Sequence, residues 1–170
     1  DYLCWQSKNA NSYSASTYST TININAVNDA PTTSGGSATP VEDATQTFTT
    51  TASDWGFADV DSGDAMTSID FTSLPATGTL MYSGSAVTEG QDIAIADLGG
   101  VTYVPVANAN GAVTFTFKVY DGEALSANPG TYTMTYSAVD DVPICDAGSA
   151  QSVAEGASVS LDGTGSSDVE

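Results

Sequence analysis

The sequence predicts an all-β chain folded as tandem β-sandwiches. Stretches rich in Thr, Val, Ile, Tyr and Phe alternate polar with apolar residues, which is the composition and period of half-buried strands. Clusters of Gly, Asp, Asn and Ser separate these stretches at short intervals. Of the 170 residues, 41% are hydrophobic, enough to bury a substantial core. Short, regularly spaced strands of this kind favour a sandwich.

In chain order, the alternating pattern predicts strands at residues 19–27, 114–120, 131–139 and 157–161. In the second of these, Phe115, Phe117 and Val119 share one face and belong to the predicted core. Turn signals occupy residues 61–64, 83–85, 110–111 and 121–122. Residues 93–98 predict no more than a single helical turn, so strands account for the architecture.

A linker pattern occurs twice. Residues 24–31 read Ile-Asn-Ala-Val-Asn-Asp-Ala-Pro, and residues 136–143 read Tyr-Ser-Ala-Val-Asp-Asp-Val-Pro. Each has a last strand, two polar or acidic residues and, one position later, a proline that stiffens the exit from a sandwich. The sequence therefore predicts a complete central domain at residues 31–142, between an N-terminal piece, 1–30, and a C-terminal piece, 143–170.

The charge balance excludes several partners. Two Lys and no Arg or His stand against 21 acidic residues, for a net charge of −19. Nucleic acid binding needs clustered cations, and an anionic membrane would repel this chain. No apolar run reaches the roughly 20 residues that span a bilayer, so membrane insertion is not expected. Divalent cations are the expected compensation for the carboxylates; a salt-adapted soluble surface is the alternative.

The central region carries six segments that together resemble the cadherin-like repeats of large bacterial surface proteins and adhesins. They are residues 41–43 (Val-Glu-Asp), 57–61 (Phe-Ala-Asp-Val-Asp), 74–80 (Leu-Pro-Ala-Thr-Gly-Thr-Leu), 101–105 (Val-Thr-Tyr-Val-Pro), 107–111 (Ala-Asn-Ala-Asn-Gly) and 117–122 (Phe-Lys-Val-Tyr-Asp-Gly). The resemblance implies a Greek-key β-sandwich, a secreted protein at the cell surface, and Ca²⁺ at the domain junctions.

The two ends have a resemblance of their own. Residues 146–168 are similar to the first half of a PKD-type immunoglobulin-like domain, and residues 1–6 look like its missing continuation. The chain lacks an initial Met and a signal peptide, so we expect a processed protein or an excerpt: one period of a tandem array, cut inside this small domain of roughly 60 residues. Neighbouring copies are the expected partners, head to tail, either covalently continuous or joined by strand addition.

The two cysteines fit this arrangement. If copies follow one another, Cys145 of one copy and Cys4 of the next lie roughly 30 residues apart, and a disulfide there would contribute about 3–4 kcal/mol. Such a pairing requires an oxidising compartment. The alternative is two unpaired, buried cysteines.

Candidate Ca²⁺ ligands follow from the resemblance, which places them on both sandwiches and on the linker of each junction. For the N-terminal junction the candidates are Asn28, Asp29, Asp59, Asp61 and Glu155. For the C-terminal junction they are Asp140, Asp141, Glu42, Asp121 or Glu123, and Asp168, Glu170 or Asp1. Asp59 and Asp61 are two residues apart, so on an extended chain both carboxylates project to one side. The alternative is solvated turn residues.

The function predicted is a calcium-stabilised structural repeat of an extracellular filament or giant surface adhesin, forming a linear rod of sandwiches. The alternative is a calcium-dependent adhesion module that binds a carbohydrate or a surface receptor. An enzyme is not expected, because the chain has no His base and no nucleophile elbow. The large aromatic residues are assigned to the core rather than to sugar stacking: Trp5, Trp55, Phe57, Phe115 and Phe117. Lys118 falls on the opposite, solvated face.

Overall fold

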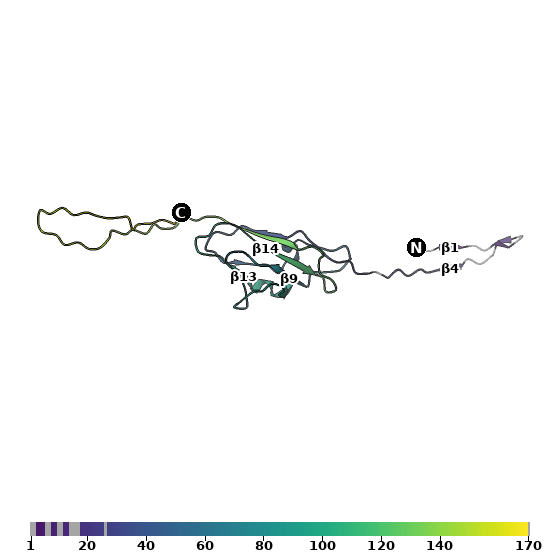
Figure 1. The fold of residues 1–170 in the computed structure, drawn as a ribbon. Helices are drawn as coiled ribbons and strands as arrows, with labels where there is room; N and C mark the ends of the chain where they lie inside the picture. Colours follow the sequence, from purple (N-terminus) through teal and green to yellow (C-terminus); the bar gives the residue numbers. More distant parts are fainter. Residues whose placement is uncertain (1–2, 6–7, 10–11, 14–17, 26, 170) are drawn as a thin grey trace.

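The protein is elongated, with one central β-sandwich between two arms (Figure 1). The structure, a computed structural model, describes residues 3–5, 8–9, 12–13, 18–25 and 27–169. We call the described residues up to Ala30 the N-terminal arm and residues 142–169 the C-terminal arm. The arms leave the sandwich at opposite ends, so the molecule has the shape of a rod segment.

The larger sheet of the sandwich has five strands in the order β12-β9-β14-β15-β6. Their bounds are β12 Asp92–Ala94, β9 Ser68–Ser73, β14 Gly111–Tyr120, β15 Gly130–Tyr136 and β6 Gly36–Ala38. Neighbours are antiparallel except β6 and β15, which run parallel. The long β14–β15 pair forms the centre of this sheet.

The smaller sheet has four antiparallel strands in the order β11-β10-β13-β7. They span β11 Ser85–Ala86, β10 Thr79–Tyr82, β13 Val101–Val104 and β7 Gln46–Thr47. The turn between β10 and β11 lies at Ser83–Gly84, where the sequence predicts one.

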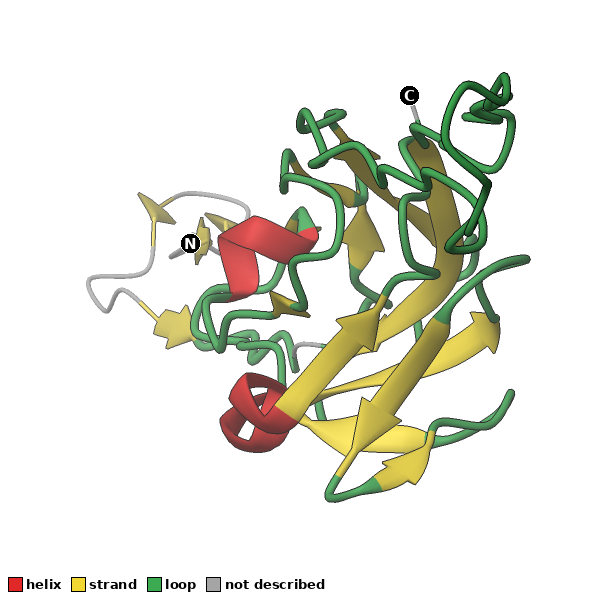
Figure 2. Cartoon of the chain, turned by 90° about the vertical axis from the view of Figure 1, so that its left-hand side faces the viewer, coloured by secondary structure: helices red, strands yellow, loops and turns green. Residues whose placement is uncertain are grey.

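Three short features complete the sandwich. Strand β5, Thr32–Thr33, pairs with β8, Phe57–Ala58. Two 3-10 helices, η1 Ala52–Trp55 and η2 Ile95–Gly100, are drawn red in the view along the long axis (Figure 2). Helix η2 overlaps the predicted helical turn at residues 93–98. The all-β sandwich prediction is confirmed.

The core lies between the two sheets and is rich in aromatic rings. Trp55 is fully buried, and its ring meets that of Phe117 edge-on at 5.0 Å between centroids. Phe115 and Tyr132, from β14 and β15, stack at 5.3 Å. The buried members of this hydrophobic cluster lie between positions 48 and 136: Phe48, Trp55, Met66, Ile69, Phe71, Leu80, Val87, Ile93, Leu98, Val101, Tyr103, Phe115, Phe117, Val119, Tyr132, Met134 and Tyr136. The core assignment of Trp55, Phe115 and Phe117 is confirmed, and Phe57 packs against the cluster partly buried.

Two segments that are distant in the sequence meet at Gly78. The hydroxyl of Tyr103 on β13 donates a hydrogen bond of 2.9 Å to the carbonyl of Thr77. Gly78 has a left-handed backbone with φ of 66°, and a Cβ there would overlap the Tyr103 hydroxyl. The turn therefore needs glycine for two independent reasons, conformation and space.

Gly78→Ala should lower the free energy of unfolding by about 1–2 kcal/mol more than Gly84→Ala does. Gly84 also has a positive φ, 79°, but a Cβ there would meet nothing within 4 Å. The control therefore carries only the backbone strain, and the difference isolates the overlap with Tyr103. Urea denaturation of both variants measures it, and equal losses would contradict the packing argument.

The arms depart from the sequence-based strand assignments. In the N-terminal arm, β1 Leu3–Trp5 pairs with β4 Tyr18–Thr20, and β2 Lys8–Asn9 pairs with β3 Ser12–Tyr13. The predicted strand at 19–27 was too long, because strand structure ends at Thr20. The predicted strand at 131–139 also ends early, at Tyr136.

The predicted strand at residues 157–161 was wrong for this chain. These residues lie in the C-terminal arm, an open loop whose ends meet at a bridge between Ile144 and Ser167 (Figure 1). A strand needs a neighbour for its backbone N–H and C=O groups, and among the described residues no strand pairs with residues 157–161.

Candidate metal centre

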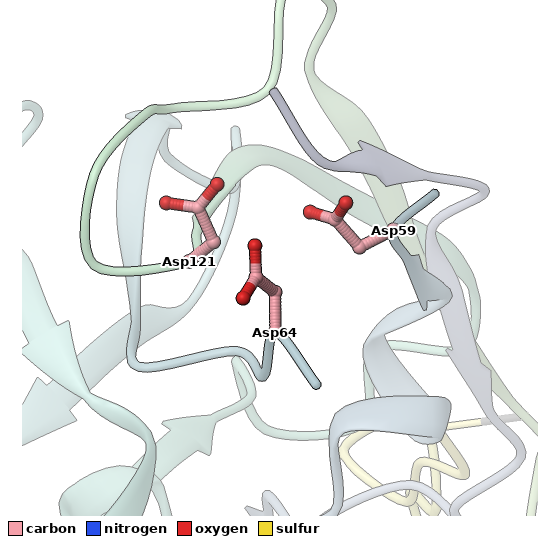
Figure 3. Close-up of side chains that lie close together, drawn as sticks. All are labelled: Asp59, Asp64 and Asp121. Atoms are coloured by element: carbon pink, nitrogen blue, oxygen red, sulfur yellow. The ribbon is translucent and has the colours of Figure 1, made fainter. Parts of the chain in front are cut away.

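Three aspartates converge at the end of the sandwich from which the N-terminal arm leaves. Asp59 follows β8, Asp64 lies in the loop before β9, and Asp121 follows β14. Each offers a carboxylate oxygen, and these oxygens all lie within 4.8 Å of one another. Figure 3 shows the three side chains directed toward a common point from three separate segments. Oxygen atoms gathered in this way suit a hard divalent cation.

Local hydrogen bonds hold two of these segments in place. The Asp59 carboxylate accepts the Asp61 N–H at 2.9 Å, which tightens the turn after β8. Gly63, with φ of 107°, then reverses the chain so that Asp64 returns toward Asp59. Asp121 accepts two backbone N–H groups at Oδ1, from Glu123 at 2.6 Å and Ala124 at 2.7 Å. Hydrogen bonds within the loops thus help to hold the Asp59 and Asp121 carboxylates in place.

The linker of the N-terminal arm rests on this cluster. Asn28 Nδ2 donates to Asp121 Oδ2 at 3.1 Å, and the Asp29 N–H donates to Asp61 Oδ2 at 2.7 Å. A hollow of about 400 Å³ lies between the linker and the loops, lined by Val27, Asn28, Asp61, Ser62, Asp64 and Glu123. The cluster is therefore the seam between the arm and the sandwich.

The charges in the cluster are only partly compensated. Burial, and then the neighbouring carboxylates of Asp59, Asp61 and Asp121, raises the pKa of Asp64 above its ordinary value. The Ala124 N–H, followed by other hydrogen bonds, lowers the pKa of Asp121. Asp59 Oδ2 is buried and accepts no hydrogen bond from any described residue. A cation at this point would satisfy that oxygen and relieve the repulsion, so the donor set fits Ca²⁺.

The structure brings together most of the ligands proposed for this junction and adds others. Asn28, Asp29, Asp59 and Asp61 lie at the seam, as the sequence predicts. Asp121 and Glu123 were assigned to the opposite end of the domain, and that placement was wrong. Strand β14 runs the full length of the sandwich, and its last residue, Tyr120, delivers Asp121 to the N-terminal seam.

Sequence reasoning missed Asp64, which it treated as a turn residue. The signal that could have found it is the spacing Asp-x-Asp-Ser-Gly-Asp over residues 59–64. A glycine turn between the second and third aspartates folds the last carboxylate back onto the first. An extended chain, as predicted for Asp59 and Asp61, has no such reversal.

At the opposite end, Glu42 joins the sandwich to its outgoing linker. Glu42 is only 6% exposed, and its Oε1 accepts the Val139 N–H at 2.6 Å. Its own N–H donates to the Ser137 carbonyl at 2.9 Å, which extends the parallel contact between the residues after β6 and those after β15. Glu42 therefore fixes the chain immediately before Asp140 and Asp141.

Acidic residues of the linker and the C-terminal arm meet near this point. Asp141 and Asp168 line one hollow of about 190 Å³ together with Asn108, and Asp140 is exposed beside them. Within this chain, neither hollow at the seams is lined by Glu155. Glu155 and Cys145 are exposed on the C-terminal arm, far from the N-terminal cluster.

Some predictions fall outside what the structure describes. Asp1 and Glu170 are not among the described residues. Cys4 and Trp5 are placed in β1 by their backbone, and their side chains lie outside the description. Lys118 is half-buried and in register with Asp70 of β9.

Comparison with known proteins gave one match. A family model described as a cadherin-like domain matches residues 27–137, a range that contains the acidic cluster, its linker and the whole buried core. No curated protein and no solved structure gave a significant match. Within the part of the chain that the structure describes, no helix is long and apolar enough to cross a membrane.

Proposed function

The chain belongs to the cadherin-like domain family, and from that premise we propose that it is a calcium-stabilised structural repeat of an extracellular filament or giant surface adhesin. Domains of this family are generally non-enzymatic adhesion or structural modules, are typically extracellular, and typically bind calcium. The proposal assigns calcium to the seams between sandwiches, where it stiffens a linear array.

One observation carries the proposal: three carboxylates converge where the linker meets the sandwich. Asp59, Asp64 and Asp121 bring oxygens within 4.8 Å, and the linker is already bonded to Asp61 and Asp121. An acidic cluster placed in a solvated turn would carry no mechanical consequence. Placed at this seam, it couples cation binding to the position of the arm.

The residues around the cluster supply the coupling. Bound Ca²⁺ would contribute a double positive charge that offsets the carboxylates and accepts six to eight oxygen ligands. Asp59, Asp64 and Asp121 would hold it from the sandwich, with Asp61 and Glu123 at the rim of the same hollow. On the linker, the Asn28 side chain donates to Asp121 and the Asp29 backbone N–H donates to Asp61. A cation that fixes these carboxylates would therefore also fix the linker.

We assign a second, weaker candidate site to the C-terminal seam. Asp141 and Asp168 line one hollow, Asp140 precedes Asp141 in the linker, and Glu42 anchors that linker through Val139. Glu155, of the small domain before the central sandwich, is proposed as a ligand at the N-terminal seam, and Glu170 or Asp1, of the small domain after it, is proposed at the C-terminal seam. The array would then carry calcium at both ends of every central sandwich.

Removal of calcium should leave the central sandwich folded but free the arm to swing. Expected affinity is that of extracellular modules, with a Kd of about 10⁻⁴–10⁻³ M. At about 10 mM Ca²⁺, such binding stabilises the folded chain by about 1.4–2.7 kcal/mol. Calorimetric melting with calcium and with EDTA measures this shift, and Mg²⁺ at the same concentration controls for ionic strength.

Small-angle X-ray scattering provides the mechanical readout for the same samples. With calcium we expect the scattering of a stiff, extended particle; with EDTA we expect a broader distribution of dimensions and unchanged circular dichroism. Identical scattering curves together with an unchanged melting temperature would contradict calcium locking at the seam.

A further inference from the structure

We infer that a groove along one lateral edge of the central sandwich binds a neutral carbohydrate, with Asp54, Gln46 and Tyr132 as its principal contacts. This inference goes beyond the proposed structural role, because it adds a ligand on the side of the rod. It does not depend on calcium, since the groove shares no lining residue with the hollows at the two seams.

The groove lies between the edge strands of the two sheets. Strand β6 ends the larger sheet, β7 ends the smaller one, and residues of both line a hollow of about 520 Å³. Pockets for small molecules have volumes of about 300–1,000 Å³, so this hollow has room for an organic ligand. Its polar lining residues come from β6, β7, β15 and the segment that leads into η1: Ser37, Gln46, Thr49, Ser53, Asp54 and Tyr132.

The segment that leads into η1 is held in place by the core. The buried Trp55 ring anchors η1, and its indole N–H donates to the Thr49 carbonyl at 3.1 Å. The Thr49 hydroxyl in turn donates to Asp54 Oδ2 at 2.7 Å. The Asp54 carboxylate is therefore oriented before a ligand arrives, which lowers the entropic cost of binding.

A glycine allows β6 to form the opposite wall. A Cβ on Gly36 would overlap both the Asp54 carbonyl and the ring of Tyr132. Without that atom, β6 packs directly on η1 and on Tyr132, which lines the groove although it is only 6% exposed. A buried aromatic residue is thus part of the wall.

Asp54 and Tyr132 provide an acceptor and a donor that are not fully used. Among the described residues, Thr49 donates to one oxygen of Asp54, and nothing donates to the other, Oδ1. The Tyr132 hydroxyl donates to the Ser37 carbonyl at 3.4 Å, longer than the roughly 2.5–3.0 Å of a usual O–H···O bond. Burial, and then the charge of Asp54, raises the pKa of Tyr132, so its hydroxyl keeps its proton. A ligand hydroxyl would find both a better acceptor and a better donor here than the chain supplies.

The remaining polar side chains add neutral groups. Gln46 Nε2 donates to the Thr47 carbonyl at 2.6 Å, which leaves Gln46 Oε1 as an acceptor. The hydroxyls of Ser37 and Ser53 make no hydrogen bond to any residue that the structure describes, and each can donate as well as accept. Most of the recognition capacity of the groove is therefore uncharged.

This mixture of groups favours a neutral saccharide. Each sugar hydroxyl both donates and accepts, so a single one can bridge the Asp54 carboxylate and the Tyr132 hydroxyl. The sequence has no Arg or His, and neither lysine is among the described residues that line the groove, so phosphates, sulfates and uronic acids would be repelled. One carboxylate is too few for Ca²⁺, which takes about six to eight oxygen ligands. Ala38 and the edge of the Tyr132 ring offer apolar surface to the C–H groups of a sugar.

An extended peptide is the competing occupant, because strands at the edges of sheets can accept a further strand. Strand β6 has three residues and β7 has two, so an added strand would gain few backbone hydrogen bonds. Gly35 and Gly36 also offer no side chains to hold those of a peptide. The saccharide is therefore the occupant that the groove favours.

The test uses the ¹⁵N-labelled 170-residue chain, in calcium and in EDTA, with neutral oligosaccharides of glucose, mannose, galactose and N-acetylglucosamine as probes. Oligogalacturonate is the anionic comparison, and an uncharged peptide rich in Val and Thr is the strand probe. We expect at least one neutral oligosaccharide to shift the backbone amide resonances of Gly36, Gln46 and Asp54 in both buffers. The inference is overturned by no shift with any neutral probe, shifts confined to other residues, tighter binding of oligogalacturonate or the peptide, or binding that EDTA abolishes.

Asp54→Asn should weaken binding of the responsive oligosaccharide by about tenfold or more, because a charged acceptor becomes an amide. The asparagine oxygen still accepts the Thr49 hydroxyl, so the melting temperature should stay close to that of the parent chain. Asp97→Asn, on the exposed part of η2, removes the same charge away from the groove and should bind like the parent. Equal affinities of Asp54→Asn and Asp97→Asn would overturn the inference.

Tyr132→Phe keeps the ring that stacks on Phe115 and removes only the hydroxyl, so binding should weaken about threefold or more. The matched control is Tyr120→Phe, which removes a hydroxyl that donates to the Gly122 carbonyl outside the groove. An equal loss in both variants would mean that the Tyr132 hydroxyl does not contact the sugar. Loss of the calcium response with oligosaccharide binding intact would instead count against the proposed calcium role alone.

Discussion

Replacing Trp55 by alanine should lower the free energy of unfolding of the central sandwich by about 3–5 kcal/mol. Trp55 is fully buried, and its ring contacts those of Phe48, Phe115, Phe117 and Tyr132. Its indole N–H also donates to the Thr49 carbonyl at 3.1 Å, so alanine would leave a large cavity and an acceptor without its donor. Guanidinium denaturation followed by circular dichroism measures the loss.

Two variants bracket that result. Trp55→Phe keeps a ring in the cluster and should lose less than Trp55→Ala, although it also gives up the bond to Thr49. Leu161→Ala removes an aliphatic side chain of the C-terminal arm that is 83% exposed, and should change the stability of the monomer by less than about 0.5 kcal/mol. A Trp55→Ala loss no larger than that of Leu161→Ala would mean that the aromatic cluster does not stabilise the fold.

The sequence predicts the sandwich well because its core residues follow a short-range rule. Phe115, Phe117 and Val119 alternate along β14, and that alternation fixes both the strand and its buried face. The same rule fails for residues 157–161, where the pattern is as clear but no strand that the structure describes pairs with these residues. Alternation reports which face a strand would bury, and it does not report whether a partner is available.

The acidic cluster is less predictable because it depends on contacts between residues far apart in sequence. Asp121 lies 93 residues after Asn28, and only the register of β14 between β9 and β15 decides at which end of the sandwich it emerges. The linker residues and the Asp59–Asp61 pair are local features and were found. The position of the Asp64 carboxylate depends on a chain reversal at Gly63. The sequence suggests a turn there but does not show where the turn directs the carboxylate.

Asp64→Asn should weaken calcium binding by on the order of tenfold or more, while leaving the calcium-free protein at least as stable as the parent at neutral pH. Burial and the carboxylates of Asp59, Asp61 and Asp121 raise the pKa of Asp64 in the folded state. Ionised Asp64 is therefore unfavourable to folding without a cation. That penalty is absent below the unfolded pKa, near 3.9, and grows as the pH rises through the higher folded pKa. Asparagine removes the penalty together with the ligand charge.

Comparing Asp121→Asn with Asp64→Asn separates the effect of charge repulsion from that of metal ligation. The two carboxylates share the cluster, but the pKa of Asp64 is raised and the pKa of Asp121 is lowered. The Ala124 N–H and further hydrogen bonds lower the pKa of Asp121, so its charge stabilises the fold above the unfolded pKa, and this stability is lost as the pH falls through the folded pKa. Asp121→Asn should therefore weaken both calcium binding and the calcium-free fold. Melting curves across pH 3–8, with Asp97→Asn on the exposed part of η2 as the control, test the pair. If Asp64→Asn and Asp121→Asn lowered the calcium-free stability equally, both carboxylates would act only as hydrogen-bonded turn residues. Repulsion among the carboxylates would then not destabilise the calcium-free fold.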